Sequence, residues 1–156
     1  MPVFDHRFTV RAPLAAVAAF HHDTSALRRL TPPPMIAQLH RFDPLADGAV
    51  AEFTLWLGPL PIRWVAIHTD VDLQRGFTDT MARGPMAHWV HRHAFVSVAA
   101  DRTDVTDHIE YDYQPGLRGL VGRLLMSPPG LAFLFAYRVW ATRRAVEQTA
   151  KPAPAR

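Results

Sequence analysis

The sequence predicts an α+β fold, in which a curved antiparallel β-sheet grips a long C-terminal α-helix and two short helices follow the first strand. Two observations carry this prediction. From residue 35 to residue 113, alternating apolar and polar residues run in short segments separated by turn signals, as in an antiparallel meander. After Gln114-Pro115-Gly116 the apolar residues take the spacing of a helix instead.

The first part of the chain predicts one strand and two short helices. Residues 3–11 alternate between apolar and polar side chains. Residues 13–22 are rich in Ala and begin with a proline, which suits the first turn of a helix. Residues 23–25 offer an N-cap for a second helix over 26–30, which the prolines at 32–34 end.

Six further strands are predicted, each bounded by turn residues such as Asp-Gly or Gly-Pro. They cover residues 35–42, 49–57, 62–72, 77–83, 88–99 and 103–113.

Two amphipathic helices are expected after the sheet. Residues 117–125 place one apolar stripe on a helix, made of Leu117, Leu120, Val121, Leu124 and Leu125. Residues 131–149 predict the longest helix, with an arc that should cover the sheet. That arc holds Leu131, Leu134, Phe135, Val139, Thr142, Ala145 and Val146. Arg138 falls inside it.

The same helix carries a second apolar strip, formed by Phe133, Tyr137 and Trp140. This strip suggests packing by the 117–126 segment or by another subunit, and therefore a possible homodimer. No linker or repeat divides the chain, so residues 1–150 are expected to form one domain and residues 151–156 a frayed tail.

Composition excludes several classes of protein. With 156 residues, 49% of them apolar and 20% charged, the chain is typical of one globular domain. It has no Cys, and therefore no disulfide or thiolate site. The N-terminus lacks the pattern of a signal peptide, and no wholly apolar run is longer than that of residues 131–137, which is too short to span a membrane. A cytoplasmic protein without stable membrane insertion is expected.

Charge and glycine patterns argue against nucleic acids and nucleotides. The net charge is +3, but the 17 basic residues are scattered, whereas a phosphate-tracking surface needs a basic stripe. The glycines of residues 116–122 lack both the dinucleotide-binding spacing and the Lys-Ser/Thr of a phosphate loop. We expect no nucleic-acid partner and no nucleotide cofactor.

Polar residues on three neighbouring strands give the main functional signal. Counting in twos, one face carries Phe77 and Asp79, then Trp89, His91, His93 and Phe95, then Asp107, Ile109 and Tyr111. Two carboxylates and two imidazoles therefore share a face with aromatic side chains. This mixture indicates a lined cavity with a polar patch.

The predicted cavity lies between the sheet and the long helix. Its interior should include Phe77, Trp89, Phe95, Ile109, Leu134 and Phe135. The residues expected to contact a ligand are Trp56, Trp64, Phe77, Asp79, Trp89, His91, His93, Asp107, Tyr111 and Arg138. Trp56 and Leu57 flank the turn at residues 58–61, which could form the rim of an entrance together with the 117–126 segment.

Several short motifs add a family resemblance. They are residues 8–20, Gly76-Phe77-Thr78-Asp79, Gly84-Pro85, residues 89–95 (WVHRHAF), residues 107–111 (DHIEY) and Tyr137-Arg138. Over residues 3–148 the chain resembles the START-related helix-grip superfamily (SRPBCC), which includes polyketide cyclase/dehydrase-like proteins, and in particular a bacterial branch of unassigned function. The resemblance implies a ligand cavity between sheet and helix. It leaves the activity open, because this superfamily holds binders, lipid carriers and enzymes.

Three interpretations of the polar patch stay open. Asp79, His91, His93 and Asp107 are the catalytic candidates, because His beside a carboxylate suits proton transfer. His91 and His93 with one Asp would also give an open three-ligand metal site, but the resemblance carries no metal motif and we expect no cofactor. The favoured interpretation is a layer that braces the sheet or orients a ligand, in which Arg138 pairs with Asp79 or Asp107.

The expected function is binding or carriage of a hydrophobic or amphipathic small molecule, lipid-like or polycyclic aromatic, with His91 or His93 exposed to anchor it. The alternative is a cyclase, dehydratase or hydrolase that uses a His/Asp pair in the same cavity. A second alternative is a protein-interaction module that uses the strip of Phe133, Tyr137 and Trp140.

Overall fold

A computed structural model describes residues 1–149, and within them one seven-stranded sheet and five helical segments. The elements are β1 (Val3–Val10), α1 (Leu14–His22), α2 (Ala26–Arg29), β2 (Met35–Phe42), β3 (Val50–Leu57), β4 (Leu60–Asp72), β5 (Gly76–Arg83), β6 (Met86–Ala99), β7 (Arg102–Tyr113), η1 (Gly116–Gly119), α3 (Leu120–Leu125) and α4 (Pro128–Thr149). The tail expected at residues 151–156 lies outside the described residues.

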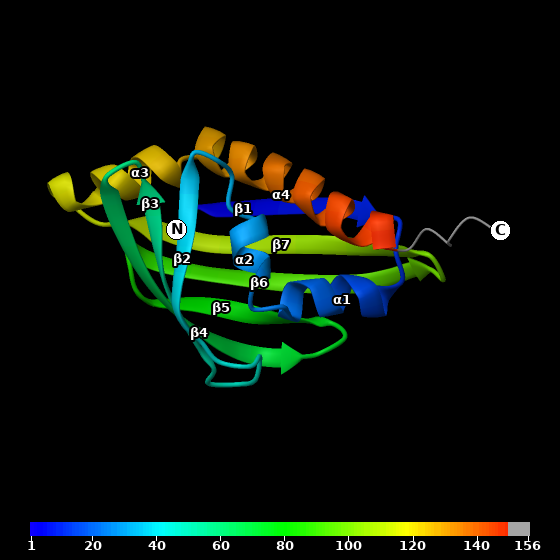
Figure 1. The fold of residues 1–156 in the computed structure, drawn as a ribbon. Coiled ribbons are helices and arrows are strands. Elements are labelled where there is room, and N and C mark those ends of the chain that lie inside the picture. The colour runs from blue at the N-terminus through cyan, green and yellow to red at the C-terminus, as the bar shows by residue number, and fades with distance from the viewer. Residues whose placement is uncertain (150–156) are drawn as a thin grey trace.

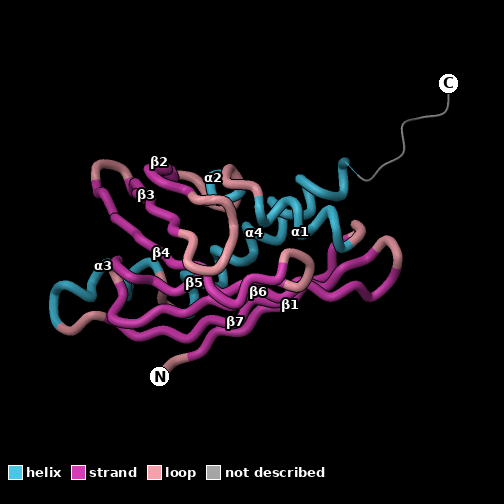
Figure 2. The backbone as a smooth tube through the Cα atoms, turned by 90° about the horizontal axis from the view of Figure 1, so that it is seen from below, coloured by secondary structure: helices cyan, strands magenta, loops and turns pink. Residues whose placement is uncertain are grey.

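The sheet is antiparallel throughout, with the strand order β1-β7-β6-β5-β4-β3-β2. Figures 1 and 2 show α1, α2 and α4 on one side of its β5–β7 part, while β2 and β3 bend towards that same side. The helices therefore lie in the concave face of a curved sheet. The α+β fold class predicted from the sequence is confirmed.

The long helix α4 packs its predicted arc against the sheet. Leu131, Leu134 and Phe135 are at most 8% exposed, and Thr142 and Val146 are also buried. The helix begins three residues earlier than expected, at Pro128. Two prolines open it, because the first turn of a helix needs no amide hydrogens from its first residues.

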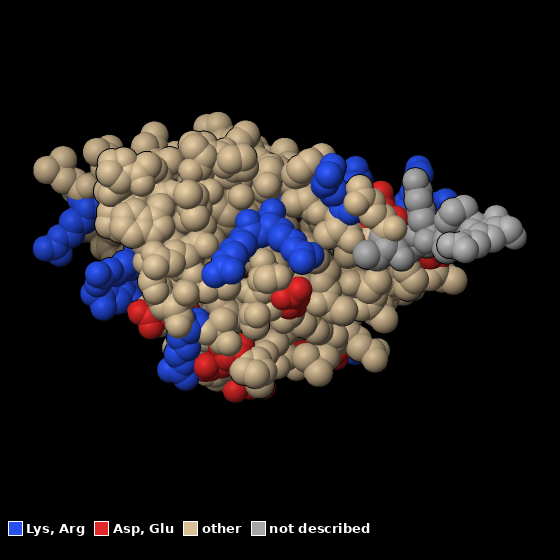
Figure 3. Space-filling view, viewed as in Figure 1, with Lys and Arg blue, Asp and Glu red and all other residues tan. Residues whose placement is uncertain are grey.

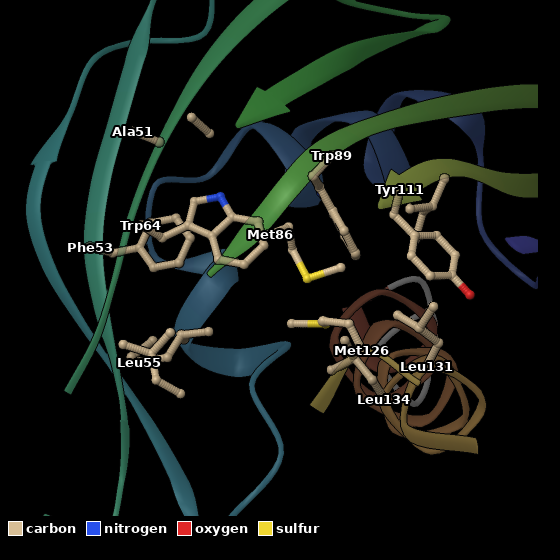
Figure 4. Close-up of a cluster of buried hydrophobic side chains, with 14 of the residues drawn as sticks. Ala51, Phe53, Leu55, Trp64, Met86, Trp89, Tyr111, Met126, Leu131 and Leu134 are labelled. Atoms are coloured by element: carbon tan, nitrogen blue, oxygen red, sulfur yellow. The ribbon is translucent and has the colours of Figure 1, made fainter. Parts of the chain in front are cut away.

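The core forms two clusters along the groove between sheet and helices. Figure 4 shows one of them, where Met86 and Trp89 on β6 point towards Met126, Leu131 and Leu134. The six side chains predicted to be interior, Phe77, Trp89, Phe95, Ile109, Leu134 and Phe135, are all buried. The alternation of apolar and polar residues in the strands, and the spacing of apolar residues in α4, therefore predicted the inner faces correctly.

The apolar stripe predicted over residues 117–125 is only partly buried. Val121 and Leu125 pack against the core, but Leu117, Leu120 and Leu124 are 62–89% exposed. The reason is that residues 116–119 form a 3-10 turn, with three residues per turn, and α3 is only six residues long. One stripe cannot then face the core along the whole segment.

The second apolar strip of α4 faces outwards in the single chain. Phe133 is 62% and Trp140 54% exposed, and Tyr137 lies against Trp140 with ring centroids 5.4 Å apart. The guanidinium of Arg144 covers the Trp140 ring. The helical stretch Gly116–Gln148 is long and apolar enough to cross a membrane by length and composition, but a core helix passes the same test.

Candidate functional site

A cavity of about 150 Å³ is lined by residues of the sheet and of the helices α1, α2 and α4. Its wall is mainly apolar, with Leu27, Leu30, Phe53, Leu55, Trp64, Trp89, Met126 and Leu134 among the lining residues. Polar side chains reach it from five elements: His21 and His22 on α1, His68 on β4, Asp79 on β5, His91 and His93 on β6, and Arg138 on α4. Three more, Asp23, Thr31 and Asp43, line it from connecting segments. A volume of this size holds several waters or one small apolar body.

Most of the predicted ligand contacts line this cavity, but three do not. Trp64, Phe77, Asp79, Trp89, His91, His93 and Arg138 line it. Asp107 lies behind the two β6 histidines, and Tyr111 is buried in the core at 3% exposure.

The placement of Trp56 in the cavity wall was wrong. Its indole Nε1 donates a hydrogen bond to the Gln38 side chain, 2.8 Å away, and it lines a separate surface groove beside β2. Leu55 takes the inward position, so its neighbour Trp56 points to the other face. The rim expected from this turn and the 117–126 segment is likewise wrong, apart from Met126.

Strand register brings the polar residues together. Asp79 pairs with His68 on β4 and with His91 on β6, while His93 pairs with Asp107 on β7. Side chains at paired positions on one face are direct neighbours. Gly76, at φ 136°, allows this close approach, because a Cβ there would overlap the His93 carbonyl oxygen.

The result is a chain of alternating imidazoles and carboxylates across four strands. Asp107 Oδ1 lies 2.9 Å from His91 Nε2 and 3.0 Å from His93 Nδ1. Asp79 Oδ2 lies 3.2 Å from His93 Nε2, and its Oδ1 lies 2.9 Å from His68 Nε2. The His91–Asp107 and His93–Asp79 contacts have hydrogen-bond geometry, while the other two are close charge contacts.

His93 is charged at neutral pH, and the pKa of His68 is raised as well, because the effect of burial there is outweighed by Asp79. Burial opposes the charge of His93, but the two flanking carboxylates outweigh burial and raise its pKa to about 9. Burial also disfavours the charged forms of Asp79 and Asp107, yet their histidine partners hold both carboxyl pKa values well below the ordinary range. His93 is therefore an imidazolium held between two carboxylates, and its expected role as an exposed anchor is not supported.

Two neighbouring histidines stay neutral. Burial, together with the His93 charge, lowers the pKa of His91 to about 4 and that of His21 to about 4. His91 donates from Nε2 to Asp107, and His21 donates from Nδ1 to the Val17 carbonyl at 2.8 Å. The other ring nitrogen of each is then an acceptor without a hydrogen bond to any described residue.

The predicted contact between Arg138 and Asp79 or Asp107 was wrong. No carboxylate oxygen of the described residues lies within 4.0 Å of its guanidinium, because histidines already occupy both Asp side chains. Arg138 Nε is buried without a hydrogen-bond partner, and the nearest defined partner is the Phe135 ring, 5.1 Å from Cζ. Burial lowers the pKa of this guanidinium.

Sequence reasoning missed three of the cavity histidines. His68 could have been found, since it continues the inward series Ile62, Trp64 and Ala66 at every second residue of β4. His21 and His22 stand in the last turn of α1, and no spacing relates them to β6. Their place at the site depends on how α1 lies across the sheet (Figure 1).

Asp79, His91 and His93 could also hold a metal ion, since they offer ligand atoms within 4.8 Å of one another. Such an ion would have to displace the proton of His93, which the two carboxylates stabilise. The geometry of these three side chains therefore suits a metal ion, but the stable proton on His93 disfavours metal binding.

We predict that the free energy of unfolding is greatest near pH 6.5 and falls on either side. His93 has a folded pKa above the ordinary value of 6.5, so its contribution is complete below pH 6.5 and is lost as pH rises to about 9. His21 and His91 have lowered pKa values, so their contributions are complete above pH 6.5 and are lost as pH falls to about 4. Urea unfolding at several pH values measures this profile.

The variant His93→Gln is the control for the alkaline side. It should remove the share of the loss between pH 6.5 and 9 that belongs to His93, because Gln does not titrate. The remaining loss belongs to His68, whose pKa is also raised. A parent protein whose stability does not change over that interval would contradict a charged His93.

The comparisons with known proteins give structural neighbours only. No protein-family model matches the chain, and no curated protein matches it. An aromatase/cyclase (Zhui) from Streptomyces sp. R1128 superposes with a TM-score of 0.76 at 16% identity, covering 99% of both chains. Norcoclaurine synthase from Thalictrum flavum gives a TM-score of 0.68 at 17% identity, covering 97% of this chain and 89% of its own.

A protein from Chromobacterium violaceum has a TM-score of 0.74 at 13% identity, covering 94% of this chain and 99% of its own. Identities this low establish the fold and not the activity. The protein has the helix-grip fold, in agreement with the resemblance of its motifs to the START-related superfamily.

Proposed function

We propose that the protein binds a hydrophobic or amphipathic small molecule in the cavity between sheet and helices. The observation that carries the proposal is a mainly apolar cavity of about 150 Å³ with polar groups in its wall. Cavities of this composition are the usual small-molecule sites of proteins. Cavities of similar volume and apolar lining bind ligands the size of a benzene ring.

The cavity volume favours a compact ligand over a large polycycle. One or two rings, or part of an acyl chain, would occupy it, with any remainder extending from the cavity. The norcoclaurine synthase structure holds dopamine and hydroxybenzaldehyde, two single-ring molecules, in a protein of the same fold. This supports a small aromatic body for the ligand without identifying it.

A second candidate function is an enzyme that moves a proton in the same cavity. It is favoured by the imidazolium of His93 beside neutral His91, and by neutral His21, whose ring centroid lies 6.2 Å from that of His93. An acid and a base with separated pKa values can act as a pair. Turnover that disappears in a folded His91→Gln variant would favour the enzyme, whereas loss of affinity without turnover in the parent would favour carriage.

The binding proposal predicts that the fluorescent amine N-phenyl-1-naphthylamine binds the parent protein and that Leu30→Trp weakens this binding at least about tenfold. Leu30 lines the cavity and is half-buried, so the larger indole can fill the space with little strain on the fold. A fluorescence titration measures both affinities, and native mass spectrometry of protein from its own host tests for a bound ligand.

Leu73→Trp is the matched control, because Leu73 is 57% exposed in the turn between β4 and β5. It should bind the probe as the parent does. Equal binding by Leu30→Trp and the parent would place the probe outside the cavity and argue against the proposal.

A further inference from the structure

Arg138 is a cation in the cavity wall with no anionic partner among the described residues. Its Nε is buried and makes no hydrogen bond, and the defined contact of its guanidinium is with the face of Phe135. The charged groups of the neighbouring strands are paired: His93 lies between Asp79 and Asp107, and His68 lies against Asp79. Among the described residues that line the cavity, Arg138 is a cation with no carboxylate in contact.

The nearby carboxylates do not provide Arg138 with a partner. Asp79 and Asp107 lie nearby, but their oxygens contact imidazoles at 2.9–3.2 Å. A guanidinium has five N–H donors in a fixed planar fork, and buried donors without acceptors are unfavourable. A cation–π contact satisfies the face of the group and leaves the buried Nε–H without an acceptor.

The helix fixes the side chain at this place. Arg138 stands four residues after Leu134 and four before Thr142, which are 8% and 1% exposed. Residues four apart lie on the same face of a helix, so Arg138 starts from the buried side of α4. Arg138 is half-buried, and its Nε is among the buried atoms.

We propose that the ligand of this cavity carries an oxyanion, such as a carboxylate, which the Arg138 guanidinium binds. The inference rests on the proposed function, since it names the chemical class of the molecule bound in the same cavity. A carboxylate or sulfonate matches the guanidinium fork with two parallel hydrogen bonds. The apolar body then lies against the walls around Trp64, Trp89 and Leu134, which line the same cavity. The class of ligand is therefore a compact organic acid.

Two probes that differ by one acidic group test this inference. 1-Anilinonaphthalene-8-sulfonate and N-phenyl-1-naphthylamine share the same two-part aromatic body, and only the first carries a sulfonate. In Arg138→Met, the affinity for the sulfonate should fall at least about tenfold, the effect of losing a hydrogen-bonded charge. The affinity for the neutral amine should change less than about threefold, because Met keeps the apolar stem. Fluorescence titration measures both.

Three controls test whether the effect of Arg138→Met comes from the lost charge in the cavity. Arg144→Met removes an exposed Arg of the same helix and should change neither affinity. Leu30→Trp should weaken both probes if both bind in the cavity. The thermal midpoint of Arg138→Met should not be lower than that of the parent, because Met keeps the apolar stem and removes a half-buried charge that has no ion pair.

The outcomes distinguish the two proposals. Equal loss of both probes in Arg138→Met, or unchanged sulfonate affinity, would overturn the oxyanion inference and leave the apolar binding site standing. If neither probe binds the parent protein, or neither responds to Leu30→Trp, the proposed function fails and this inference fails with it.

Discussion

Asp107→Asn is expected to lower the free energy of unfolding by about 3–5 kcal/mol, the usual cost of breaking a buried ion pair. Asp107 is 5% exposed and contacts both His91 and His93. The substitution keeps the size of the side chain and removes one of the two carboxylates that hold the His93 imidazolium. The buried charge is then left with Asp79 alone. Urea unfolding at pH 7 measures the loss.

Asp5→Asn is the matched control for this prediction. Asp5 pairs with His108, but its side chain is 70% exposed. Exposed ion pairs contribute about 0–1 kcal/mol, so this change should be small. A loss for Asp107→Asn no larger than that of the control would show that the His–Asp chain does not depend on its buried charges.

Phe135→Ala is expected to destabilise the protein by about 3–5 kcal/mol through the cavity it leaves. Phe135 is 1% exposed and contacts three rings, with centroid distances of 5.2 Å to Phe4, 5.4 Å to His6 and 5.7 Å to His91. Its ring also lies beneath Arg138, so the variant should loosen the guanidinium as well. Thermal and urea unfolding measure the effect.

Phe133→Ala tests the same substitution two residues earlier on the same helix. Phe133 is 62% exposed, so its removal should change the free energy of unfolding by about 0.5 kcal/mol or less. A large loss at this position would mean that another surface covers the outer strip of α4. That result would favour the interaction module over the ligand-binding domain.

The charged side chains on the surface do not indicate a binding site as the buried ones do. Figure 3 shows the Lys and Arg side chains of one face in separate groups, with Asp and Glu between some of them. The expectation that nucleic acid is not a partner stays a prediction, as do the cytoplasmic location and the homodimer.

The sequence by itself determined the fold class and the inner face of most strands. Period-two alternation is a local property, and it placed Asp79, His91 and His93 in the cavity wall because neighbouring side chains of a strand must point to opposite faces. The same rule would have included His68. The rule failed at Trp56, because the sequence around it has no clear alternation to show which side chains point inward. The inward residue there is its neighbour Leu55.

The tertiary structure alone decided which charges pair. Strand register places His93 against Asp107 and His68 against Asp79, so histidines take the carboxylates that the sequence assigned to Arg138. The position of α1 brings His21 to the same cavity. Contacts between distant segments depend on register and helix placement, which no local spacing encodes. The unpaired guanidinium of Arg138 could therefore be recognised only from the structure, in which Asp79 and Asp107 contact histidines instead.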